Sequence, residues 1–149
     1  MGKRAVSAVA VAALALAMLS GCEAKPGAFV RSSAQADVAA WTQDARSAIG
    51  SPVATVKFDG FQTCRTDTGY FATRFQWHTV TNLAVPASRQ TAEVAAISRS
   101  FAAMGWRSKS AAGIVTITGP AAAARRGIVL VQTAGATQLA VAVTSPCYG

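Results

Sequence analysis

The sequence predicts an α+β fold, a two-layer sandwich in which an antiparallel sheet of about five strands carries two helices on one face. Two segments repeat apolar residues at helical spacing, and five others have the alternating or β-branched pattern of strands. Turn-forming Gly, Pro and Asp residues separate these segments. The predicted order is α-β-β-α-β-β-β, in a chain of 149 residues that is too short for two ordinary domains.

The first helix is predicted over residues 32–49. Ser32 and Gln35 have the spacing of a capping box, which would begin the helix at Ser32. Apolar residues then recur at helical spacing, and Trp41 among them is expected to anchor the helix in the core. Gly50 is expected to end the helix, because glycine accepts left-handed backbone and a proline follows two positions later.

The second helix is predicted over residues 86–104, with Ser88 as its N-cap. Gly105 suits the position after the helix, where Trp106 could pack back on the last turn. We expect the residues of the apolar stripe and Trp106 to lie in the core rather than to bind a cofactor. The residues of that stripe are Val94, Ile97, Phe101 and Met104.

The predicted strands comprise a pair and a later group of three. Residues 53–65 and 70–83 form the pair, with a hairpin loop at 66–69. The later strands are 114–118, 127–132 and 138–144. In the last of them Leu, Val and Val alternate with Ala, so one face is expected to be bulky and buried.

One strand carries the nearest approach to a polar constellation. Along residues 70–83, apolar and threonine side chains occupy one face, and Arg74, Gln76 and His78 occupy the other. This stripe is a candidate binding surface, but a solvated outer face shows the same pattern and is the favoured interpretation. His78 has no partner acid or thiol at a recognisable spacing.

The N-terminal segment predicts a signal peptide over residues 1–21. Lys3 and Arg4 precede an uncharged apolar run of 14 residues, which is shorter than the roughly 20 that a spanning helix needs. The next residues, Leu19-Ser20-Gly21-Cys22, resemble the bacterial lipobox. That resemblance implies a diacylglyceryl group on Cys22, cleavage just before it, and attachment to the outer side of the cell membrane.

Two alternatives to the lipobox remain, an ordinary secretory signal and an uncleaved anchor helix. With cleavage before Cys22, residues 22–31 would be a tether that contains Pro26 and Gly27, and residues 32–149 would form a single domain. Two acyl chains on one cysteine would anchor that domain stably, since one chain gives only marginal binding.

The other two cysteines, Cys64 and Cys147, are predicted to form a structural disulfide. A protein outside the cytoplasm can keep such a bond, and two cysteines allow only one pairing. The bond would close a loop of 83 positions and stabilise the fold by about 4 kcal/mol.

Charge restricts the partners. Without Lys3 and Arg4 the chain has 12 basic and 6 acidic residues, and the basic ones are mostly dispersed. Basic proteins often bind nucleic acid, but an exported protein seldom meets it. An envelope protein, anionic lipid or an acidic wall polymer is the expected partner, with no nucleic acid.

No motif in the sequence names a reaction. A single histidine cannot supply a multi-histidine metal site, and no nucleophile elbow or phosphate-binding glycine loop is present. We therefore expect no metal, no cofactor and no catalytic residue, in a binding or structural module of the envelope. The alternatives are a carrier that holds an acyl chain in an internal apolar cavity and, less favoured, a hydrolase.

A family resemblance supports this expectation. The lipobox, the alanine-rich helices, Gly105-Trp106 after a helix, and the terminal Ser145-Pro146-Cys147 together resemble small lipoproteins of actinobacteria. The resemblance covers most of the chain, although only the lipobox is a specific motif. It implies attachment to the cell membrane and supplies no substrate or site residue.

Overall fold

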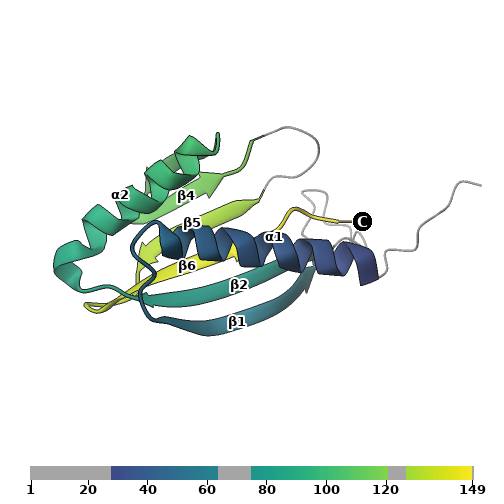
Figure 1. Cartoon of the computed structure of the whole chain (residues 1–149), viewed down its shortest axis with the longest axis horizontal. Helices are drawn as coiled ribbons and strands as arrows, with labels where there is room; N and C mark the ends of the chain where they lie inside the picture. Colours follow the sequence, from purple (N-terminus) through teal and green to yellow (C-terminus); the bar gives the residue numbers. More distant parts are fainter. Residues whose placement is uncertain (1–27, 64–74, 121–126, 149) are drawn as a thin grey trace, which may run out of the picture.

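A computed structural model describes residues 28–63, 75–120 and 127–148. These residues form two helices and six strands, which confirms the α+β class (Figure 1). The helices are α1 (Ala28–Ser47) and α2 (Ala87–Ala103). The strands are β1 (Ala54–Thr63), β2 (Phe75–Ala84), β3 (Arg107–Ala111), β4 (Ile114–Thr118), β5 (Ile128–Thr133) and β6 (Gln138–Thr144).

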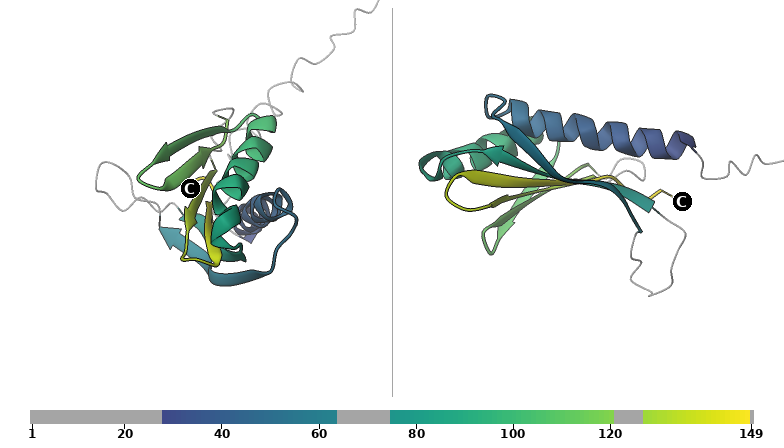
Figure 2. Two further views of the ribbon diagram at one scale, coloured as in Figure 1. Left: turned by 90° about the vertical axis from the view of Figure 1, so that its left-hand side faces the viewer. Right: turned by 90° about the horizontal axis from the view of Figure 1, so that it is seen from below.

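The strands form one antiparallel sheet in the order β1-β2-β6-β5-β4-β3. Both helices lie on one face, which we call the inner face (Figure 2). α1 packs on β2 and β6, α2 packs on β3 to β6, and the two helices contact each other. Within the described residues, no layer covers the opposite face, which we call the outer face.

The sheet has six strands rather than the predicted five, because β3 was missed. All five residues of β3 are exposed, so its sequence shows no apolar alternation. A two-residue turn holds β3 against β4, and the turn residues Ala112 and Gly113 have φ angles of 50° and 77°. Two positive φ angles match the twist of a hairpin, but alanine seldom occupies such a position. The turn therefore lacked its usual sequence signal.

α1 begins earlier than predicted. The helix starts at Ala28, so Ser32 and Gln35 lie within it and do not form the expected cap, and residues 28–31 belong to the helix rather than to a tether. Its buried face has helical spacing, as predicted, and includes Val38 and Ala45. Gly50 ends the final turn with a φ of 77°, and the next backbone N–H donates to Arg46 O at 2.9 Å.

α2 is close to its predicted range but is capped differently. Pro86, rather than Ser88, is the N-cap residue, and it makes no side-chain capping hydrogen bond. The start of α2 is instead fixed by buried Gln90, whose Nε2 donates to Val85 O at 3.1 Å and Gly135 O at 2.9 Å. Met104, which was expected in the core, is 45% exposed, because it follows the helix on its solvent side.

The core fills the space between the two layers. Alternate residues of β2, β4, β5 and β6 point inward, and in β6 the bulky Leu139, Val141 and Val143 are buried as expected. They meet the apolar faces of α1 and α2 in one continuous cluster. Burial of apolar surface between a helix layer and a sheet is the main stabilisation that such a sandwich has.

Three aromatic rings join the helices at the centre of this core. Trp106 packs edge to face against Trp41 of α1 and Phe101 of α2, with 5.0 Å between ring centroids in both pairs. Gly127 lies directly against the Trp41 ring, and a Cβ atom at this position would come within 2.2 Å of it. Glycine is therefore required at residue 127 by close packing, not by an unusual backbone angle.

We predict that Gly127→Ala lowers the free energy of unfolding by roughly 1–3 kcal/mol, because the new methyl group displaces the Trp41 ring. Gly119→Ala is the matched control, since its Cβ would lie 3.4 Å from Trp106, an ordinary contact. Urea denaturation of both variants measures the difference. Equal losses of stability in the two variants would contradict the packing described for Trp41.

Candidate functional site

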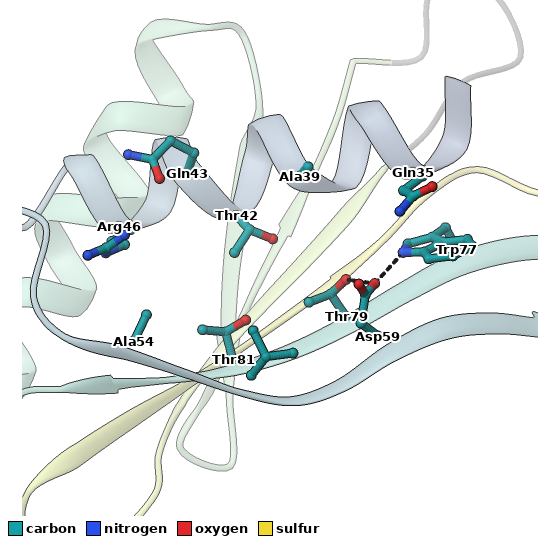
Figure 3. Close-up of a pocket in the computed structure, with 11 residues that line it drawn as sticks. Gln35, Ala39, Thr42, Gln43, Arg46, Ala54, Asp59, Trp77, Thr79 and Thr81 are labelled. Atoms are coloured by element: carbon teal, nitrogen blue, oxygen red, sulfur yellow. Dashed lines mark hydrogen bonds between the residues drawn. The ribbon is translucent and has the colours of Figure 1, made fainter. Parts of the chain in front are cut away.

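An open groove of about 280 Å³ lies between α1 and the first two strands (Figure 3). It exists because α1 packs over β2 and β6, which leaves the inner face of the edge strand β1 uncovered. Val56 of β1 points toward this groove and is 60% exposed. The lining residues are Gln35, Ala39, Thr42, Gln43 and Arg46 of α1, Ala54, Val56 and Asp59 of β1, and Trp77, Thr79 and Thr81 of β2.

A small polar network forms part of the floor. Asp59 pairs with Thr79 across the two strands, and Trp77 is the diagonal neighbour. The Trp77 indole N–H donates to Asp59 Oδ1 at 2.5 Å, and the Thr79 hydroxyl donates to the same oxygen at 3.1 Å (Figure 3). These two bonds fix the carboxylate against the sheet.

Thr81 adds a buried hydroxyl to the same floor. Its side chain is 2% exposed, and Oγ1 has no hydrogen-bond partner among the described residues. A buried polar group without a partner costs about 1–3 kcal/mol. Thr81 lines the groove, but its hydroxyl oxygen is closed to solvent, so it belongs to the buried part of the floor.

The wall is a stripe of α1 side chains at positions 35, 39, 42, 43 and 46, which recur at helical spacing. The Thr42 hydroxyl donates to Val38 O at 2.8 Å, and Gln43 Nε2 donates to Ser47 Oγ at 3.0 Å. Arg46 Nε donates to Pro52 O at 2.8 Å, which ties the end of α1 to the loop before β1. One cation, Arg46, and one anion, Asp59, are the charged groups of the groove, so its chemistry is mixed rather than strongly charged.

The polar stripe predicted on β2 lies away from this groove. Gln76 and His78 point to the outer face, and Arg74 lies outside the described residues. The His78 imidazole shares a hydrogen bond of 2.8 Å between Nδ1 and Thr144 Oγ1, and its ring centroid is 5.7 Å from that of Phe58. Partial burial lowers the pKa of His78 from its usual value.

The predicted disulfide concerns the end of the sheet at which β1 ends and β2 begins. Cys22 and Cys64 lie outside the described residues. Cys147 follows β6, and its Sγ lies 3.7 Å from Gln76 Oε1. Thr63, which precedes Cys64 in the sequence, pairs with Phe75, and Phe75 pairs with Tyr148 on its other side. The residues next to both cysteines in the sequence are thus aligned across the same end of the sheet.

The described residues contain no group of three or more His, Cys, Asp or Glu side chains that could hold a metal ion. None of the helices in this part of the chain is long and apolar enough to cross a membrane.

The sequence did not predict the groove, because a candidate site was sought among the polar residues on the solvent-facing side of β2. The signal lay on the apolar face of β2, where Thr79 and Thr81 continue the line of Trp77. Asp59 is the matching charge on the inner face of β1. Polar side chains at positions expected to be buried were the informative feature.

Comparisons of this chain with known protein families, with curated proteins and with solved structures found no match.

We predict that the stability of the protein falls as pH drops from 8 to about 5.5, because the folded state disfavours the protonated imidazole of His78. Its folded pKa is lower than the unfolded value of about 6.5, so its contribution is complete above that value and is lost at lower pH. His78→Gln should reduce this pH dependence, and His78 is the sole histidine of the sequence. Urea unfolding at both pH values measures the effect, and an unchanged pH dependence in the variant would contradict it.

Proposed function

We propose that the protein is an extracytoplasmic lipoprotein, anchored through Cys22, that serves as a non-enzymatic binding module of the cell envelope. The lipobox sequence Leu19-Ser20-Gly21-Cys22 after a short apolar run supports the anchor. The described fold begins at Ala28, only a few residues after Cys22, as expected for a domain held close to a membrane. A disulfide between Cys64 and Cys147 belongs to this proposal, and the alignment of Thr63 with Tyr148 through Phe75 supports it.

The groove between α1 and β1 is the proposed binding site, and the observation that carries this assignment is its uncovered β1 side, where Val56 is 60% exposed and the Asp59 carboxylate is exposed. An accessible apolar side chain beside a charged group, on the sheet face that packs against helices, is typical of a binding surface. The separation of the titratable groups favours binding over catalysis. Asp59 lies in the groove with both hydrogen bonds from neutral donors, and His78 lies on the outer face.

The proposed occupant is an extended segment of an envelope protein. β1 is an edge strand of ten residues, so half of its backbone N–H and C=O groups point away from β2. A peptide that pairs with this edge would place alternate side chains against the groove, a mode of recognition known as β-augmentation. Both edges have features that disfavour pairing, a bulge at Lys57 in β1 and Arg107 and Lys109 in β3, but β1 is twice as long and offers more backbone groups to a partner.

We predict that the intact protein extracted from membranes has a mass that begins at Cys22 and includes acyl groups. Without reductant, iodoacetamide should add no mass, because Cys64 and Cys147 are joined, whereas reduction should expose two thiols. Cys22→Ala should abolish the acyl mass and leave the precursor. Native mass spectrometry measures all three outcomes.

Each result in that experiment tests one part of the proposal. A mature chain with no acyl mass would refute the lipid anchor, and alkylation of Cys147 without reductant would refute the disulfide. A non-covalently bound lipid would favour the acyl-chain carrier over the peptide-binding module.

We predict that Thr81→Val raises the free energy of unfolding of the isolated protein by roughly 1 kcal/mol, because it removes a buried hydroxyl that has no partner. The matched control is Thr79→Val, which should destabilise the protein, since the Thr79 hydroxyl donates to Asp59. Binding is tested with Asp59→Asn, which removes the anion of the groove and keeps an acceptor for Trp77 and Thr79. This change should weaken crosslinking to a benzoylphenylalanine placed at Val56 in cells.

The crosslinked product must be a polypeptide, and mass spectrometry identifies its segment. Pairing is tested by Ala54→Pro. Ala84 N–H donates to Val53 O, so in the alternating antiparallel register the N–H of Ala54 points away from β2, and proline removes this donor from the open edge. Crosslinking that persists in both Asp59→Asn and Ala54→Pro would argue against the groove as the binding site. A loss of stability in Thr81→Val would show that the hydroxyl already has a partner.

A further inference from the structure

The two faces of the molecule differ in charge. The carboxylates of the described residues are Asp37, Asp44, Asp59 and Glu93, and all of them lie on the helices or on the inner face of β1. The outer face, followed through the pairing register across all six strands, therefore holds no acidic residue in the part of the chain that the structure describes. Because β3 places Arg107 and Lys109 on this face, both exposed, it is purely basic.

Apolar side chains accompany these cations. Phe58, Ile114 and Ile128 are large hydrophobic residues of the outer face that are 41%, 36% and 38% exposed. Between them lie uncharged residues, mostly Thr, Gln, Asn and Ala. Six strands about 4.8 Å apart make this face roughly 24 Å wide. A broad surface with exposed apolar groups and a cationic edge fits an anionic interface that also accepts apolar side chains.

The number of residues between Cys22 and α1 limits the distance between the lipid anchor and the described fold. Five residues separate Cys22 from Ala28, so the lipid attachment point lies within about 20 Å of the start of α1. α1 begins at one end of the molecule rather than over the middle of the sheet (Figures 1 and 2). The connection can therefore pass the end of the sheet and reach the plane of the outer face.

We propose that the outer face of the sheet rests on the surface of a bilayer that contains anionic phospholipid, so that the groove between α1 and β1 faces away from the membrane. This inference rests on the proposed lipid anchor. It names a bilayer rather than an acidic wall polymer, because the exposed Phe58, Ile114 and Ile128 gain from contact with a lipid interface and not from contact with a hydrophilic polymer.

The test uses the lipidated full chain in vesicles of phosphatidylcholine, with or without phosphatidylglycerol, and a nitroxide-headgroup lipid as quencher. A fluorophore is attached in separate samples at Gln132→Cys, on the outer face, and at Ala92→Cys, on the exposed side of α2. We expect stronger quenching at residue 132 in the anionic vesicles. Arg107→Gln/Lys109→Gln should lower the ratio of docked to undocked protein by roughly tenfold or more.

Arg99→Gln is the control, because it removes an exposed cation of α2 that is not part of the Arg89–Glu93 ion pair, and it should leave the quenching difference unchanged. Vesicle flotation tests the anchor independently. If the protein floats and quenching is equal at both positions, or greater at residue 92, the docking proposal is wrong and the anchor stands. The docking proposal would also be overturned if the quenching at residue 132 were the same with and without the Arg107→Gln/Lys109→Gln changes. If the protein floats with neither vesicle, both proposals fail.

Discussion

The arrangement of the whole helix layer depends on the packing of Trp106 against Trp41 and Phe101. Trp41 belongs to α1, Phe101 to α2 and Trp106 to the segment that leads into β3, so one edge-to-face cluster joins α1 to the distant end of α2. The absence of a side chain at Gly127 lets Trp41 seat directly on the start of β5. A close-packed interior transmits any change at this contact to both helices.

The position of α1 explains why the molecule has a groove at all. α1 is held beside α2 and over β2 and β6, so β1 lies beyond its other flank and the groove opens between them. The inner face of β1 consequently stays accessible, and the polar floor of Asp59, Thr79 and Thr81 lies where a fully covered sheet would have apolar residues. The position of α1 that fills the core therefore also creates the candidate site.

The sequence predicted the class of fold because that depends on periodicity, and α1, α2, β4 and β6 all have strong patterns. β3 was not predicted, because it is held by a turn at Ala112 and Gly113 and by pairing with β4, and neither feature leaves an apolar pattern in the sequence. The burial of Trp106 was predicted correctly from its position after Gly105. The burial of Met104 was predicted wrongly, because its exposure depends on where the helix layer ends. The groove could not be predicted, since it arises from the lateral position of α1, which no local pattern encodes.

The central place of β6 in the sheet has a consequence for folding. β6 is the sixth strand along the chain, yet it lies between β2 and β5 and joins the two parts of the sheet, so that His78 pairs with Thr144. A chain synthesised from its N-terminus therefore cannot complete its sheet until this strand is available. Contacts between such distant segments slow folding. Until β6 has paired with them, β2 and β5 each have an open edge that can pair with a strand of another molecule. Removal of residues 138–149 would take away β6 and divide the sheet, whereas loss of β3 would remove only an edge strand.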